Sequence, residues 1–355
     1  MKLKTPKKFM VEKNIVTIGG GTGSFMVLSG IKKYPHKITA IVSTVDDGGS
    51  TGRLRDELGV LPPGDARQCL VALSKESLAL RRFLNYRFES GELKGHTLGN
   101  LIISALEKMR GSFSDGIKEA QKIFDIEGNI MPSGCGESKL IMRMKNGRKL
   151  IGENKIYKSE EIKKENIEDI FLSPKGRANA NAVEKIKKAD LLVICPGNIY
   201  CSLLPNLLIE DISEAIKKSE AKVVYVCNLV NKLGQTDNFD LDDYAGMLNS
   251  RIGGNRIDYV LYNTRKPDEK AIERYKQEGE FLVDFRENKK SKRSYRVVKA
   301  DLLSDRLAKK ASGGLNSDEL ASRRSFIRHD SSKLAIVIDY IARMEELGGI
   351  IEEIR

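Results

Sequence analysis

The 355-residue sequence contains no tryptophan and only five cysteines, three histidines and nine prolines. The cysteines form no CxxC pair and the histidines lie far from them, so the spacing excludes the usual structural zinc sites and indicates reduced core thiols. Apolar runs are also short, since Leu191 to Cys195 and Leu334 to Ile338 fall far below the roughly 18 residues that a membrane span needs. We therefore expect no membrane span and a cytoplasmic location.

Acidic residues are outnumbered, with 49 against 61 basic residues and a net charge of +12. The excess is uneven, because residues 286–310 hold ten basic residues against three acidic ones. This window has a single aromatic residue, Tyr295, and lacks the stacking aromatics and recognition motifs of nucleic-acid-binding proteins. We interpret it as a solvated basic face that could attract an anionic ligand or a protein partner, and we expect no nucleic-acid binding.

Strand and helix patterns alternate along most of the chain. Asn14 to Ile18 predicts a strand that leads through a glycine-rich turn into an amphipathic helix, and Ile38 to Val45 predicts a strand buried on both faces. Further strands are expected at Asp190 to Cys195, Lys222 to Asn228 and Ile257 to Asn263, with a last helix over Leu334 to Ile351. The alternation favours an α/β, Rossmann-like, doubly wound and mostly parallel sheet with C-terminal helices.

Residues 128–173 depart from this alternation. Short strand patterns separated by turn signals dominate there, and Lys145-Asn146-Gly147-Arg148 is typical of a β-hairpin turn. We predict a small inserted β subdomain over residues 128–173. The Rossmann-like nucleotide-binding domain would then consist of residues 1–127 and 174–355.

A glycine-rich loop follows the first predicted strand. Such a loop allows backbone N–H groups to approach a phosphate, and the positive end of the following helix dipole adds to the attraction. The loop is not a P-loop, because Phe25 stands where the lysine would be, and Ser24 replaces the third glycine of a dinucleotide fingerprint. A tight turn without a ligand is the alternative. The predicted phosphate or nucleotide loop consists of Gly19, Gly20, Gly21, Thr22, Gly23 and Ser24.

Two adjacent carboxylates, Asp46 and Asp47, end the second predicted strand before Gly48. This is where a Rossmann acid binds a ribose hydroxyl. Together with Asp65 from the next loop, the pair could instead hold Mg²⁺ that bridges phosphate oxygens. Capping of the turn is the alternative without a ligand. Magnesium is thus a possible cofactor, and none is certain.

Further polar residues follow predicted strands or precede predicted helices, and in a parallel sheet the loops after the strands share one edge. Arginines there could bind phosphate in a bidentate manner, and a histidine could donate to phosphate or act as an acid or base. Surface charges and a helix-entry histidine are the ordinary alternatives. Cys201 has no nearby histidine and is not favoured as a nucleophile. The remaining candidate ligand-binding residues are Arg53, Arg67, His96, Asn100, Gly197, Asn198, Tyr200 and Asn228.

Several of these motifs, in this order, resemble the YvcK or gluconeogenesis factor family. The resemblance covers roughly residues 13 to 345. It is carried by Gly19 to Gly23, Thr44 to Arg55, Leu61 to Asp65, Gly95 to Asn100, Pro196 to Tyr200, Leu204 to Leu208, Asn228, Gly234 to Thr236 and Arg328 to Asp330.

That family is grouped with the 2-phospho-L-lactate transferases of the CofD type, which use Mg²⁺ and carboxylates to join a phospholactyl group to a deazaflavin. The resemblance implies a Rossmann-like fold, a nucleotide-type pocket and a metal role for Asp46 or Asp47 and for Asp65. YvcK-like proteins are associated with cell shape, growth on gluconeogenic carbon and UDP-sugar binding, with no established reaction.

The sequence departs from the family pattern in the second half of the site. Relatives commonly read Gly-Pro-Gly-Ser-Leu-Tyr-Thr-Ser where this chain has Cys195 to Ser202, and Met-Thr-Gln-Pro-Gly-Glu-Thr where it has Val230 to Thr236. Two hydroxyls and one carboxylate are lost. We expect a different ligand preference if those groups contact the sugar or the base.

Three hypotheses follow from the sequence. The first is a cytoplasmic regulatory protein that binds a UDP-sugar, with regulatory protein partners and a homo-oligomeric state. The second is a Mg²⁺-dependent, phospholactate-transferase-like enzyme that acts on a phospho-acid donor and a nucleotide-like acceptor. The third is an NAD-binding protein, because Rossmann sites with an acid after the second strand accept adenine dinucleotides.

Overall fold

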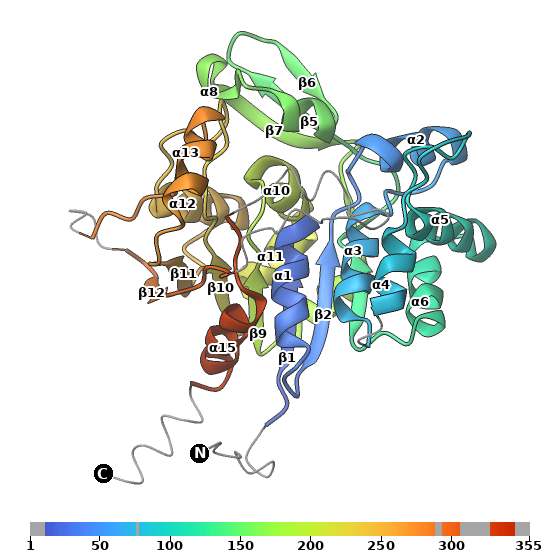
Figure 1. The fold of residues 1–355 in the computed structure, drawn as a ribbon, viewed down its shortest axis with the longest axis horizontal. Helices are drawn as coiled ribbons and strands as arrows, with labels where there is room; N and C mark the ends of the chain where they lie inside the picture. The colour runs from blue at the N-terminus through green and yellow to red at the C-terminus, as the bar shows by residue number, and fades with distance from the viewer. Residues whose placement is uncertain (1–10, 76–77, 288–292, 306–326, 345–355) are drawn as a thin grey trace.

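The computed structural model describes residues 11–75, 78–287, 293–305 and 327–344. A seven-stranded, entirely parallel sheet forms the centre of the molecule, in the order β12-β11-β10-β9-β1-β2-β3 (Figure 1). The strand order reverses between β1 and β9, as in a doubly wound Rossmann-like sheet, so the predicted fold class is confirmed. The strands are β1 (Asn14–Ile18), β2 (Lys37–Val42), β3 (Asn129–Pro132), β9 (Leu191–Ile194), β10 (Lys222–Val226), β11 (Tyr259–Asn263) and β12 (Arg296–Ala300).

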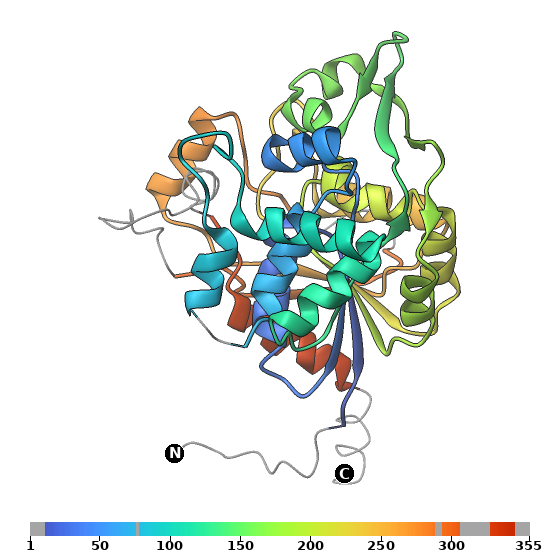
Figure 2. The same cartoon turned by 90° about the vertical axis from the view of Figure 1, so that its right-hand side faces the viewer.

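Helices cover both faces of the sheet, which explains why the central strands are almost continuously apolar (Figure 2). Val27 and Leu28 of α1 join the core on one face, and Ile186 of α9 joins the core on the other. The first face carries α1 (Gly21–Ile31), α3 (Gly64–Leu73), α5 (Leu98–Arg110), α6 (Phe113–Ile123) and α15 (Ser331–Ala342). The second carries α9 (Ala180–Lys187), α11 (Glu210–Lys218) and α12 (Leu241–Ile252).

The α/β part of the chain outside the inserted segment contains three further helices. They are α2 (Gly49–Leu58), α4 (Leu78–Asn85) and α13 (Glu269–Gln277). No helix among the described residues is long and apolar enough to cross a membrane.

A small antiparallel sheet lies beyond the carboxyl ends of the main strands, where β2 points in Figure 1. Its central strand β5 (Lys139–Met144) pairs with β6 (Lys149–Ile151) and β7 (Ile167–Ser173). The predicted hairpin turn is confirmed, with Gly147 at φ +85° and the Arg148 N–H donating to Asn146 Oδ1 at 3.0 Å. Around this sheet lie α7 (Glu153–Lys158), α8 (Ile162–Glu165) and a two-stranded ladder of β4 (Gly134–Cys135) and β8 (Arg177–Ala178).

The start of the inserted segment differs from the prediction. Residues 129–132 form β3, which pairs in parallel with β2 and is an edge strand of the main sheet. Leu140, Met142 and Ile170 of the small sheet also belong to the same apolar cluster as Ile186 of α9. The inserted segment is therefore built on the core of the main sheet and shares it.

Other boundaries differ for local reasons. The second strand ends at Val42, three residues earlier than expected. The helix expected near Leu203 to Lys218 is divided into a π-helical turn (Ile199–Leu203), α10 (Leu204–Leu207) and α11, because Pro205 lacks an N–H and fits only a first helical turn. The last helix begins at Ser331, where Asp330 accepts hydrogen bonds from two backbone N–H groups. Residues 345–351 of that prediction lie outside the described residues.

The basic window of residues 286–310 contributes the unpredicted edge strand β12. Some of its charges are paired, since Arg293 contacts Asp242 at 2.8 Å and Lys299 contacts Glu287. Positions 288–292 and 306–310 of the window lie outside the described residues.

Candidate functional site

The site is built where the strand order reverses, at the carboxyl ends of β1 and β9. The glycine loop after β1 and the Pro196-Gly197-Asn198 loop after β9 are in direct contact there. A Cβ atom at Gly23 would lie 1.6 Å from the carbonyl oxygen of Pro196. The glycine at position 23 is therefore required by the packing of these two loops, at the place where doubly wound sheets bind their ligands.

The carboxylate of Asp65 lies against the glycine loop. The Gly21 N–H donates to Asp65 Oδ1 at 2.8 Å, and a Cβ atom at Gly20 would lie 1.9 Å from Asp65 Oδ2. The chain thus places its own anion at the N-terminus of α1, where the helix dipole favours negative charge. Gly21 differs, because its φ is +61° and a Cβ atom there would have no neighbour within 4 Å. Gly21 is the glycine that faces open space, and Thr22 and Ser24 follow it in the first turn of α1.

Three carboxylates influence one another at this edge: Asp46, Asp65 and Glu153. Burial raises the pKa of Asp46, opposed by the hydrogen bond that Gly48 N–H donates at 2.9 Å. Burial, and then the charge of Asp46, raise the pKa of Asp65 to about 7. Burial, and again Asp46, raise the pKa of Glu153 to about 8. The ionised forms repel one another, so the cluster favours protonation or a bound cation.

Glu153 was not predicted from the sequence. It begins α7, which belongs to the inserted segment, and it reaches the other carboxylates only because that segment folds back over the main sheet. No motif around Glu153 distinguishes it from an exposed helix-start glutamate, so the sequence alone offers no signal for it.

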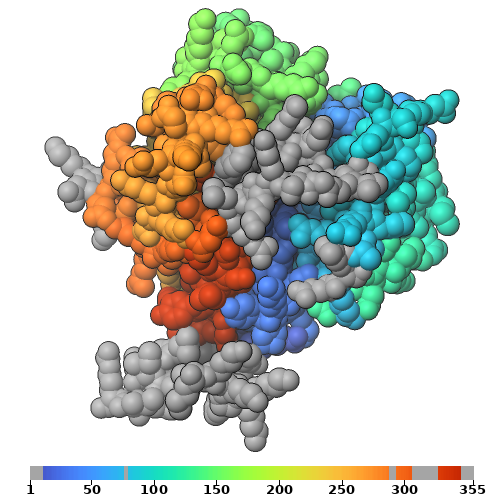
Figure 3. Space-filling view, in the orientation of Figure 1, coloured from blue at the N-terminus to red at the C-terminus, as the bar shows by residue number. Residues whose placement is uncertain are grey.

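Asp47 contacts the inserted segment instead of the glycine loop. Its Oδ1 accepts a hydrogen bond from the Asn154 N–H at 2.6 Å, and Arg55 Nη1 lies 3.9 Å from Oδ2. A Cβ atom at Gly152 would lie 2.1 Å from Oδ2, so a glycine is required there. Asp47 therefore fixes the N-terminus of α7, with a charge that suits that helix end. In Figure 3 the green inserted segment packs against both the blue and the orange parts of the chain.

The oxygen donors at this edge meet some of the requirements of a magnesium ion. Among the described residues, no three His, Cys, Asp or Glu side chains are grouped closely enough to hold a metal. Mg²⁺, however, usually takes only one or two carboxylates together with substrate phosphates and waters. Asp46 and Asp65 supply such hard oxygen donors, whereas Asp47 is already bound to Asn154. The residues thus fit Mg²⁺ in company with a phosphate ligand.

Arg67, His96 and Asn100 lie together in a buried network. Ser50 Oγ is 3.1 Å from His96 Nδ1 and accepts from Asn100 Nδ2 at 3.1 Å, while Arg67 Nε donates to Asn100 Oδ1 at 2.9 Å. Their exposure does not exceed 7%. Burial, followed by the charge of Arg53, lowers the pKa of His96, which favours a neutral ring. The network ties α2 to α3 and α5 behind the Asp46 loop.

Arg53 is not part of this network. It is exposed and donates from Nη2 to the Lys94 carbonyl at 2.5 Å.

The loops after β9 and β10 are joined by Asn228. Its Oδ1 accepts from the Gly197 N–H at 3.0 Å, and its Nδ2 donates to the Gly197 carbonyl at 2.8 Å. Asn198 Oδ1 accepts from the N–H groups of Tyr200 and Cys201 and so caps the π-helical turn. Tyr200 is 3% exposed, and burial raises its pKa to about 12. These predicted residues do converge, with their polar groups largely engaged in holding the loops.

Two departures from the family pattern meet in one contact. Asn198 Nδ2 donates to Gln235 Oε1 at 2.8 Å. Gln235 Nε2 in turn donates to the carbonyls of Ile156, Tyr157 and Ser159 at 2.9 to 3.1 Å. The lost carboxylate is thus replaced by an amide that binds α7 to the main sheet. Burial also raises the pKa of Cys201 far above its usual range, which keeps it a thiol and disfavours a nucleophilic role.

His329 is a second residue whose position was not predicted. It is 6% exposed, and burial lowers its pKa to about 4, opposed by a backbone hydrogen bond with Cys227 at the end of β10. Its Nε2 has no hydrogen-bond partner among the described residues. The motif in the sequence did not indicate that His329 pairs with Leu303 in an isolated β-bridge and lies against the end of β10.

Comparison with known proteins identifies relatives over nearly the whole chain. The family model described as 2-phospho-L-lactate transferase CofD matches residues 15–303. A protein of Thermotoga maritima is 38% identical over 330 residues, covering 93% of this chain and 99% of the relative. The protein described as gluconeogenesis factor in Halalkalibacterium halodurans is 40% identical over 271 residues, covering 76% and 83% of the two chains.

The protein of the same description in Bacillus subtilis is 34% identical over 327 residues, covering 91% of this chain and 96% of the relative. A solved structure agrees as well. The crystal structure of a UPF0052 family member from Bacillus halodurans superposes with a TM-score of 0.82 at 34% identity, covering 93% of this chain and 99% of that chain.

Proposed function

The chain belongs to the YvcK, or gluconeogenesis factor, family within the CofD-like superfamily, and we propose that it is a regulatory protein that binds a UDP-sugar. The ligand would lie at the carboxyl edge of the main sheet, between the glycine loop and the loop after β9. In this proposal the protein acts in the cytoplasm, as a homo-oligomer with regulatory protein partners, and links carbon supply during gluconeogenic growth to cell shape.

One observation supports the position of the ligand above all others. The two loops at the reversal of strand order are in contact through Gly23 and Pro196, and beside that contact Gly21 alone of the first three glycines faces open space at a helix N-terminus. A diphosphate there would receive N–H donors from the first turn of α1. Asp65 already accepts from Gly21 N–H, so the diphosphate would have to displace it, share a proton with it or share a cation with it.

The third option gives Mg²⁺ a role in the proposal. Asp46 and Asp65 would hold the ion beside the phosphates, where it would neutralise the negative charge of their oxygens. The residues of the chain then position the ligand: α1 supplies N–H groups, and Asn198 and Asn228 shape the wall after β9 and β10.

A substitution at Gly21 tests the proposed ligand position. Gly21→Asp adds bulk and like charge on the open side of the loop, so we expect it to abolish binding of UDP-N-acetylglucosamine. Gly59→Asp is a matched control, because Gly59 has the same φ of +61°, also faces open space and ends α2. Unchanged affinity in a folded Gly21→Asp protein, or equal loss in both variants, would contradict the assignment.

A second function is supported by the carboxylates. The elevated pKa values around Asp46 and Asp65 are suited to a Mg²⁺-dependent transfer from a phospho-acid donor to a nucleotide-like acceptor, as in the superfamily's transferases. Metal-dependent turnover of a guanylylated phospholactate or phosphoenolpyruvate donor would favour that function over the regulatory one.

Dinucleotide binding is the third candidate. Asp46 lies after β2, where a Rossmann acid binds ribose. Asp46→Asn would then change NAD affinity and leave UDP-sugar affinity unaffected, which a pair of calorimetric titrations measures.

A further inference from the structure

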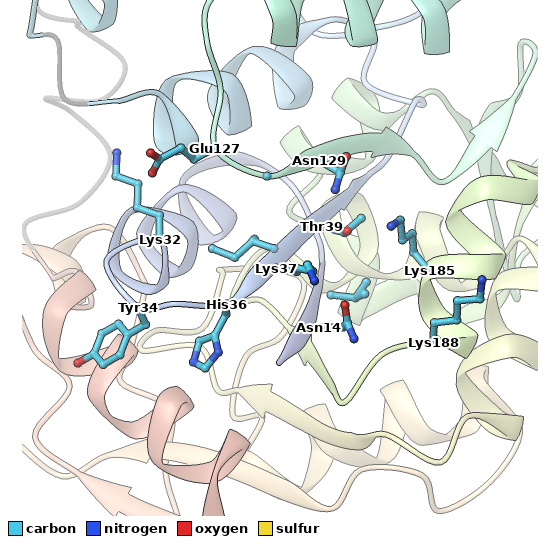
Figure 4. A pocket seen from close by; sticks show the side chains of 13 residues that line it. Asn14, Lys32, Tyr34, His36, Lys37, Thr39, Glu127, Asn129, Lys185 and Lys188 are labelled. Carbon is cyan, nitrogen blue, oxygen red and sulfur yellow. The ribbon is translucent and has the colours of Figure 1, made fainter. Parts of the chain in front are cut away.

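A second cavity lies at the opposite edge of the main sheet. It has a volume of about 620 Å³ and opens at the amino ends of β1, β2 and β3 (Figure 4). These strands are four to six residues long, which places the cavity roughly 15 to 20 Å from the glycine loop. The cavity is therefore separate from the site described above. Its volume lies within the range of roughly 300 to 1,000 Å³ that is typical of small-molecule sites.

The strand register brings polar side chains to one face at this edge. Val16 pairs with Thr39 and Thr39 with Asn129, while Asn14 pairs with Lys37 two residues earlier. Paired residues of a parallel sheet share a face, and residues two apart in a strand also share it. Helix α9 covers this same face, since its Ile186 packs in one cluster with Val16. Lys185 lies in the last turn of α9, and Lys188 directly follows the end of the helix. Both lysines line the cavity.

The lining is strongly cationic. Four lysines, Lys32, Lys37, Lys185 and Lys188, face one carboxylate, that of Glu127. Lys185 has no ion pair with any described side chain, whereas Lys32 donates to the Ser74 carbonyl at 2.7 Å.

Two of the lysines have carboxylate partners outside the lining. Lys37 pairs with Glu12 and Lys188 with Glu184, each at 2.6 Å. Both pairs are largely exposed and so contribute little, which leaves the ammonium groups able to turn to a multivalent anion. Asp190, at the edge of β9, is instead occupied by the N–H groups of Asn14.

Uncharged polar groups also line the cavity. Thr39 is 4% exposed, whereas Asn129, which begins β3, is exposed. Neither the Thr39 hydroxyl nor the Asn129 side-chain amide forms a hydrogen bond with another described residue. The hydrogen-bonding groups of these two side chains are therefore open to the hydroxyls of a ligand that enters the cavity. Figure 4 shows the Thr39 side chain between Lys37 and Lys185, with Asn129 on the neighbouring strand β3.

We propose that this cavity is a binding site for a small phosphorylated polyol of the sugar-phosphate class. The phosphate would bind the ammonium groups of Lys37, Lys185 and Lys188, and the hydroxyls would bind Thr39 and Asn129. The site is independent of the UDP-sugar site, because the two lie at opposite edges of the sheet. One ligand can thus bind without the other.

Calorimetric titration with glucose 6-phosphate tests the proposal, with glucose and inorganic phosphate as separate probes. We expect glucose 6-phosphate to bind the wild-type protein more tightly than either probe, and the double variant Lys185→Glu/Lys188→Glu to bind it at least about tenfold more weakly, because charge-assisted hydrogen bonds are lost. Lys187→Glu is the matched control: it lies on the same helix, is exposed and is not in the lining. It should bind like wild type.

Absence of glucose 6-phosphate binding to the wild-type protein would overturn the proposal, as would equal weakening in the control variant. Equal binding of inorganic phosphate would overturn the role of Thr39 and Asn129, which Thr39→Val checks independently. The same variants should be titrated with UDP-N-acetylglucosamine, and their affinity for it should equal that of the wild-type protein. This titration separates failure of the sugar-phosphate proposal from failure of the proposed UDP-sugar function.

Discussion

Replacing Asp65 by asparagine should stabilise the folded protein at alkaline pH. The variant keeps an oxygen for the Gly21 N–H and removes a charge that lies near Asp46. The rise of the Asp65 pKa from 3.8 to about 7 corresponds to about 4 kcal/mol at about 1.4 kcal/mol per unit. This is an upper limit, since Asp65 is only half-buried and shares its charge with Asp46. We expect a gain of about 1 to 2 kcal/mol in the free energy of unfolding at pH 8.

The sign of the pH dependence follows from linkage. A carboxyl with a raised folded-state pKa gives its full stability below the unfolded pKa near 4, and that stability is lost as the pH rises through about 7. The gain in Asp65→Asn should therefore be near zero at pH 4, grow up to pH 7 and level off above it.

Urea unfolding at pH 4.5 and pH 8, with chelator and without divalent ions, measures this difference. Asp56→Asn is the control, because the Asp56 side chain is 69% exposed and should show no pH-dependent gain. A gain that is equal at both pH values, or a loss at pH 8, would refute the reasoning about the carboxylate cluster.

Three further predictions concern other parts of the structure. Gln235→Ala removes the donors to three carbonyls near α7, so urea unfolding should show a loss of about 2 to 3 kcal/mol and hydrogen exchange should increase in α7. The pKa of His329 is lowered, so its contribution to the free energy of unfolding is fully present above pH 6.5 and is lost as the pH falls toward 4. His329→Gln should therefore reduce the change in the free energy of unfolding between these pH values by on the order of 1 kcal/mol, which urea unfolding at several pH values measures. Addition of Mg²⁺ with UDP-N-acetylglucosamine should release protons from the carboxylate cluster, which calorimetry in buffers of different ionisation enthalpy detects; no release would contradict a metal role for Asp46 and Asp65.

The central strands and the glycine loop could be predicted because local pattern determines them. Asn14 to Ile18 carries apolar residues on both faces and is followed by glycines. Both features are visible in the sequence without knowledge of distant contacts. The doubly wound sheet was likewise predicted from the alternation of strands and helices. Its strand order, with the reversal between β1 and β9, is known only from the structure.

The roles of individual polar residues depended on contacts between distant segments. Asp46 and Asp47 are neighbours in the sequence, yet only Asp47 accepts a hydrogen bond from the backbone N–H of Asn154, which lies 107 positions later in the chain. Glu153 and Gln235 reach the site through the same folding back of the inserted segment. Such contacts leave no local period or motif, which is why the sequence predicted the loops of the site more fully than its side-chain roles.

The central claim is tested most directly by calorimetric titration of the purified protein with UDP-N-acetylglucosamine, UDP-glucose and NAD, each with and without Mg²⁺. The contents of the calorimeter cell are analysed for product after each titration. We predict tight binding of a UDP-sugar, weaker binding of NAD and no product. Absence of UDP-sugar binding, together with metal-dependent conversion of a phospho-acid donor, would contradict the regulatory function and support the transferase.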